Sequence, residues 1–80
     1  MAPKQVIEVW GDLLVGNLWI SHVKAVLPDQ VVILTKGDWW DIYYNNEAAR
    51  IIDELIKPLL RGAMPPLWRG KVAWRVTEVV

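Results

Sequence analysis

The alternation of apolar and polar positions predicts a β-hairpin over residues 31–44, the sequence VVILTKGDWWDIYY. Gly37 and Asp38 supply the central residues of a tight turn, and glycine in the first position favours type II′ because it accepts a positive φ. This turn pairs Lys36 with Trp39 and extends the pairing to the ends of both strands. Paired residues share one side of a sheet, so the register assigns every hairpin residue to one of two faces.

Both predicted faces of the hairpin are rich in apolar residues. The first carries Val31, Ile33, Thr35, Trp40, Ile42 and Tyr44. The second carries Val32, Leu34, Lys36, Trp39, Asp41 and Tyr43. Because the first face has no charged residue, we expect it to face the core, and we expect the second to face solvent. An exposed face with this many large apolar and aromatic groups is typical of an interface. The predicted interface residues are Val32, Leu34, Trp39 and Tyr43.

Shorter patterned segments on either side of the hairpin predict the rest of a sheet. Residues 6–10 and 18–27 are expected strands, and residues 28–30 a turn. Gly11-Asp12 is an expected turn. Residues 13–15 are either a second strand that pairs back on the first or the start of a longer bent strand with a glycine bulge. Residues 71–80 alternate again and predict a final strand. Its core side is expected to carry Val72, Trp74, Val76 and Val80.

A helical period replaces the strand pattern after the hairpin. Asn46 is the predicted N-cap, and Pro58 is expected to kink or end the helix near Lys57 because it lacks an N–H. The helix should pack on the first hairpin face, against Ile33, Trp40, Ile42 and Tyr44. Its apolar stripe consists of Ala48, Ile51, Ile52, Leu55, Ile56, Leu59 and Leu60.

These elements together predict a single small α+β domain over residues 1–80. The expected architecture is an antiparallel sheet of about five strands, with a β-meander, then one α-helix, then a C-terminal strand. The helix is expected to cover one face of the sheet. A chain of this length buries a modest share of its surface, so its stability margin is small.

Composition adds a tendency toward self-association. Hydrophobic residues make up 54% of the 80-residue chain, tryptophan occurs six times, and the formal net charge is zero. There is no cysteine, which excludes disulfides and thiolate metal sites. No apolar run is long enough to span a bilayer, and we expect a cytoplasmic protein without a membrane partner.

Candidate catalytic and metal-binding residues are sparse. His22 is the single histidine, and its neighbour Ser21 points to the other face of the same strand. Asp38 and Asp41 are three residues apart across the start of a strand, so their side chains are also expected to point in different directions. The sequence has no metal-ligand spacing and no phosphate-binding glycine loop. We therefore expect neither an enzyme nor a bound cofactor or metal.

A basic and aromatic segment near the C-terminus favours an alternative function. Residues 57–75 carry five basic side chains and no acidic one. Within it, Trp68, Arg69, Lys71 and Arg75 interleave aromatic and basic groups, as in a site that stacks bases and binds phosphates. The alternative is that these cations protect an edge strand from further pairing. Zero net charge gives little long-range attraction to a polyanion, which favours the structural role.

The sequence therefore predicts a non-enzymatic protein–protein interaction or structural module. We expect a homodimer formed through an apolar and aromatic sheet face. A weak nucleic-acid binder that uses residues 68–75 is the alternative, and the sequence contains no motif that would name a reaction or a ligand.

Overall fold

The chain forms a five-stranded antiparallel sheet with one helical segment. The computed structural model describes the backbone of residues 3–62 and 68–79 and the side chains of residues 3–62 and 71–78. The strands are β1 (Lys4–Val15), β2 (Leu18–Leu27), β3 (Val31–Lys36), β4 (Trp39–Tyr44) and β5 (Trp68–Val79). The helical segment consists of α1 (Asn45–Ile51), the π-helical turn η1 (Ile52–Ile56) and α2 (Lys57–Leu60). The strand order is β4-β3-β2-β1-β5, so β5 lies at the edge opposite the hairpin.

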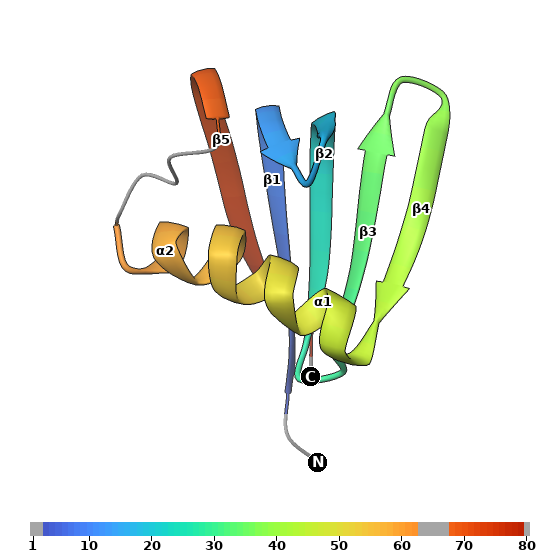
Figure 1. Cartoon of the computed structure of the whole chain (residues 1–80). Coiled ribbons are helices and arrows are strands. Elements are labelled where there is room, and N and C mark those ends of the chain that lie inside the picture. The colour runs from blue at the N-terminus through green and yellow to red at the C-terminus, as the bar shows by residue number, and fades with distance from the viewer. Residues whose placement is uncertain (1–2, 63–67, 80) are drawn as a thin grey trace.

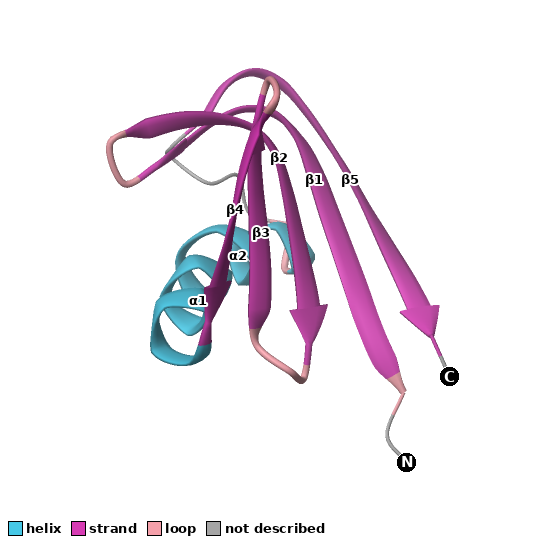
Figure 2. Ribbon diagram, turned by 90° about the vertical axis from the view of Figure 1, so that its right-hand side faces the viewer, coloured by secondary structure: helices cyan, strands magenta, loops and turns pink. Residues whose placement is uncertain are grey.

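This architecture confirms the predicted fold class. The first four strands form a meander, and the helical segment crosses the sheet before the chain returns as β5 beside β1 (Figure 1). Figure 2 shows the helical segment on one side of the sheet, while no described element covers the other side. We call the covered side the helix face and the other side the open face.

The predicted register of the hairpin is also confirmed. Lys36 pairs with Trp39, Ile33 with Ile42 and Val31 with Tyr44. Gly37 has a φ of 58°, whereas Asp38 is not in the positive-φ region, as a type II′ turn requires.

The predicted side of the hairpin is wrong. Val32 and Leu34 are buried under the helical segment, whereas Trp40 and Tyr44 are 62% and 57% exposed. The helix therefore does not pack on the face expected for it, the face of Ile33, Trp40, Ile42 and Tyr44. It packs on the opposite face, and the open face of the hairpin is the one without charged residues.

The neighbouring strands explain this reversal. On the helix face, β1, β2 and β3 align in rows without a charged residue: Ile7, Ala25 and Val32 in one, Val9, Val23 and Leu34 in the next. On the open face the equivalent rows are Glu8, Lys24 and Ile33, then Trp10, His22 and Thr35. A helix on that face would bury a carboxylate and an ammonium group, which costs several kcal/mol per ion.

A bulge bends β1 and shapes the helix face. The pairing of β1 with β2 shifts between Trp10 and Leu13, so Gly11 and Asp12 form a bulge within one bent strand that ends at Val15. The predicted turn at Gly11-Asp12 is therefore wrong, and residues 13–15 are neither a separate strand nor the start of a longer one. A Cβ at Gly11 would lie 3.1 Å from the Lys71 carbonyl oxygen, so the close approach of β5 favours glycine there. Beyond the bend, the β1–β2 hairpin curls toward the side of the helix (Figure 2), and Leu13 remains buried.

The two ends of the helical segment differ from the prediction. Its N-cap is Tyr44, without a side-chain cap bond, so Asn46 is not the N-cap. Asn45 instead adopts a φ of 55° and donates its N–H to the Gln30 carbonyl, at 3.2 Å. The segment passes Pro58, with η1 directly before α2, and closes at Gly62, which has a φ of 77°. Proline cannot donate to the preceding turn, and a widened turn accommodates this loss.

The edge position of β5 changes the expected core of the last strand. Val72 packs against the core as predicted. Trp74 and Val76 pair with the buried residues Val9 and Ile7, yet both remain largely exposed because β5 has a neighbour on one side alone. Val80, the fourth residue expected on this side, lies outside the described residues.

We predict that Leu34→Ala and Ile33→Ala will have unequal effects on stability. Leu34 is 1% exposed in the core, so its truncation should lower the free energy of unfolding by about 2–5 kcal/mol. Ile33 is half-buried on the open face, so its truncation should lower the free energy of unfolding by about 1 kcal/mol. Urea unfolding at low protein concentration measures both, and equal or reversed costs would contradict the face assignment.

Candidate functional site

The open face consists of three rows of side chains that run across all five strands. Each row follows the register from β4 to β5. The first row is Tyr44, Val31, Val26, Val6 and Thr77. The second is Ile42, Ile33, Lys24, Glu8 and Arg75. The third is Trp40, Thr35, His22, Trp10 and Ala73.

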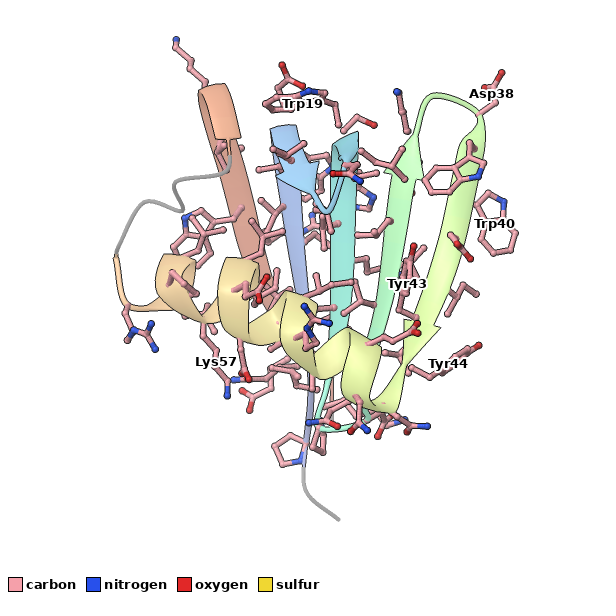
Figure 3. The ribbon with its side chains drawn as sticks, viewed as in Figure 1. Trp19, Asp38, Trp40, Tyr43, Tyr44 and Lys57 are labelled. Carbon is pink, nitrogen blue, oxygen red and sulfur yellow. The ribbon has the colours of Figure 1, made fainter. Side chains whose placement is uncertain are left out.

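One half of this face, on β3 and β4, is apolar. We call the group Val31, Ile33, Trp40, Ile42 and Tyr44 the apolar patch. Trp40 and Tyr44 are the most exposed of these residues, and both project from β4 away from the helix (Figure 3). Ile33 and Ile42 pair directly between them and are partly buried. The patch thus presents two aromatic rings around an aliphatic centre, a composition typical of protein interfaces.

The other half of the face carries a closed polar network centred on Glu8. Arg75 Nη2 donates to Glu8 Oε1 at 2.6 Å, and His22 Nε2 lies 3.0 Å from Glu8 Oε2. The Trp10 ring stacks on His22 with centroids 5.3 Å apart, and the Arg75 guanidinium lies over the same indole. Each carboxylate oxygen therefore has a partner, and the Trp10 ring covers one side of both the His22 ring and the Arg75 guanidinium.

This network lowers the pKa of Glu8 below its ordinary value of 4.5. The hydrogen bond from Arg75 is the largest cause, and the smaller effect of His22 acts in the same direction, against the desolvation of the carboxyl. Glu8 is therefore ionised at neutral pH and already neutralised by its own neighbours. The charge of Glu8 is therefore balanced without a ligand.

The free edge of β4 carries a local block against further strand pairing. The Ile42 N–H donates to Asp41 Oδ1 of the preceding residue at 2.9 Å. An added strand would have to displace this carboxylate in order to bond to Ile42. Charged groups at a sheet edge commonly prevent edge-to-edge association in this way.

The predicted interface residues do not form one exposed surface. Val32 and Leu34 lie in the core, and Tyr43 is partly buried against it. Trp39 is exposed, on the helix side of the sheet and beyond the reach of the helix. The prediction that Val32 and Leu34 face solvent is therefore wrong, because the helical segment packs on their side of the sheet.

The residues of the predicted nucleic-acid site are partly engaged. Arg75 binds Glu8 and lies over Trp10, so its charge is already paired. Lys71 is exposed on β5. The side chains of Trp68 and Arg69 lie outside the described residues. The nucleic-acid alternative remains a prediction that the structure does not test.

His22 lies on the open face, where its ring contacts the Glu8 carboxylate and stacks on Trp10. Among the described side chains, no group of three or more His, Asp or Glu residues is arranged to hold a metal ion. No helix within the described ranges is long and apolar enough to cross a membrane.

The polar network was missed at the sequence level, although its signal was present. Residues 6–10 alternate so that Glu8 and Trp10 share a side, and His22 and Lys24 do the same in the next strand. The missing information was the register between β1, β2 and β5. Without that register, no rule placed Glu8 beside both His22 and Arg75.

No protein-family model matches this sequence, and comparisons with curated proteins and with solved structures find no match either. The function is therefore inferred from the geometry of the chain itself.

We predict that Arg75→Gln will raise the pKa of Glu8, because it removes the strongest hydrogen bond to the carboxylate. A lowered folded-state pKa adds stability that is fully present above the unfolded-state value and is lost as the pH falls through the folded-state value. Carboxyl NMR titration measures the pKa directly. Arg50→Gln, on the helix, is the control and should leave it unchanged. An unshifted Glu8 in the Arg75 variant would contradict the network.

Proposed function

We propose that this chain is a non-enzymatic interaction module that forms a homodimer through the apolar patch on the open face. The observation that supports this proposal is the exposure of Trp40 and Tyr44 beside the aliphatic pair Ile33 and Ile42. No described element covers these side chains. Contiguous apolar surface of this kind usually marks a contact site.

A second copy of the chain is the partner that best suits the patch. A twofold axis parallel to the strands would lay β3 and β4 of one chain on β4 and β3 of the other, so that apolar groups meet apolar groups. The Glu8 network would lie to the side of this contact, where it needs no partner charge. The zero net charge of the chain means that two copies repel each other little.

Packing through the face is favoured over pairing through the edge. At the free edge of β4, the Asp41 carboxylate accepts a hydrogen bond from the Ile42 N–H. On the hairpin itself the open face carries no charged residue, because Lys36 and Asp41 lie on its other side. The nearest charged residue in the rows is Lys24 of β2, beside Ile33 at the inner border of the patch. Face-to-face packing of two sheets buries the side chains that the monomer leaves exposed.

Dimerisation would also add to the limited core of a small domain. The buried core consists of aliphatic side chains, and the five tryptophans whose side chains the structure describes lie outside it. Burial of one large aromatic side chain contributes about 1.5–3 kcal/mol. Two copies of the patch would therefore add substantially to the stability of the assembled form.

We predict that the wild-type chain sediments as a dimer and that Trp40→Lys converts it to a monomer. A lysine at this position would place a charge in the centre of an apolar contact. Trp39→Lys is the matched control, because Trp39 is a neighbouring, exposed tryptophan on the opposite side of the same strand. It should leave the dimer intact.

Analytical ultracentrifugation over a range of concentrations distinguishes these outcomes. A wild type that remains monomeric throughout would exclude the dimer. If both variants lost the dimer equally, the contact would be at the edge of the sheet. If both variants remained dimeric, the contact would lie outside the apolar patch. Circular dichroism confirms that the variants are folded.

A further inference from the structure

A groove on the helix face lies apart from the proposed dimer contact. It runs between the curled end of the β1–β2 hairpin and the helical segment, and its volume is about 340 Å³. This volume falls within the range of small-ligand sites. We call it the hairpin groove. Its lining residues include Val15, Leu18, Leu34, Tyr43, Ile51 and, at the helix side, Glu47, Arg50 and Glu54.

The interior of the hairpin groove is apolar. Leu34 lines it from the buried core, and Ile51 packs against the same core from the helix. Leu18 extends from the tip of the hairpin and is 42% exposed. The bend in β1 at Gly11 brings this leucine toward the helix, so that one side of the groove is a hairpin and the other a helix.

The mouth of the groove is acidic. Glu47 and Glu54 both line it, and Arg50 lies between them on the same helical segment. The pKa of Tyr43, in the groove wall, is raised by burial and by the negative charges of Asp41 and Glu47. The lining thus carries two carboxylates and one guanidinium, a net charge of one negative unit that favours a cation over an anion.

We propose that the hairpin groove binds a small amphiphile with a short apolar chain and a single cationic head. The chain passes between Leu18 and Ile51 toward Leu34. The ammonium group remains at the mouth, where the Glu54 carboxylate can accept its hydrogen bonds. Apolar lining with a few polar groups at one end is the usual arrangement of a site that orients such a ligand.

This site is independent of the proposed dimer. The groove opens on the helix face, whereas the apolar patch lies on the other side of the sheet. A dimer formed through the open face leaves the groove accessible. Failure of either proposal therefore leaves the other one standing.

The test is a titration of the wild-type chain with n-octylammonium, followed by amide NMR. We expect saturable shifts at Leu18, Tyr43 and Ile51. Octanol and octanoate have the same chain with a neutral or anionic head, and both should bind more weakly. Equal or tighter binding of octanoate would overturn the cationic assignment. Shifts centred on Trp40 and Ile33 would show binding at the open face and overturn the site.

Two variants connect the binding to the acidic mouth. Glu54→Gln should weaken octylammonium binding by about two- to fivefold, the usual effect of one exposed charge pair. Asp53→Asn is the matched control, because Asp53 is the neighbouring acid on the same turn and pairs with Lys57 instead of lining the groove. It should leave the affinity unchanged. Equal weakening in both variants would indicate general electrostatic attraction and overturn the assignment of Glu54.

Discussion

The constraint on which the structure depends is the polarity of the two central strands. β1 and β2 each have one apolar side and one side with charged or polar groups, with Glu8, His22 and Lys24 all on the open face. Burial of a charged group without full compensation costs more than the burial of one aliphatic side chain contributes. The helix must therefore cover the side of Ile7 and Val23. Every strand that joins these two has its inward side decided by register, whatever its own composition would favour.

The β3–β4 hairpin shows the force of this constraint. Considered alone, its uncharged side is the better core, and its own pattern predicts the helix there. Its pairing with β2 overrides that preference, because Val32 and Leu34 align with Ala25 and Val23. The charges at Lys36 and Asp41 are tolerated on the helix face because they lie near the turn, where they remain exposed. The consequence is an apolar patch on the open face, with the aromatic residues at its outer edge.

Local signals account for the parts of the fold that could be predicted. The turn at Gly37 and most of the helical stripe are properties of a few neighbouring residues, and the structure agrees with both. Leu60, at the end of the predicted stripe, is 40% exposed instead. The side of the hairpin, the Glu8 network and the exposure of Trp74 depend on which strands become neighbours. Those outcomes require the order β4-β3-β2-β1-β5, which no short segment specifies. The sequence pattern therefore placed Val32 and Leu34 on the solvent side of the hairpin, although the register with β2 buries them.

The distribution of charge on the hairpin argues for an open face that is meant to be covered. A monomer protected against association would carry its charges where its apolar surface is exposed. Here Asp41 protects the free edge, because its carboxylate accepts the hydrogen bond of the Ile42 N–H. The two charged residues of β3 and β4, Lys36 and Asp41, lie on the helix face. Edge pairing is therefore opposed, while Trp40 and Tyr44 remain without any charged neighbour in their own strand rows on β3. Protection of the edge without protection of the face is the arrangement expected of a sheet that associates through its face.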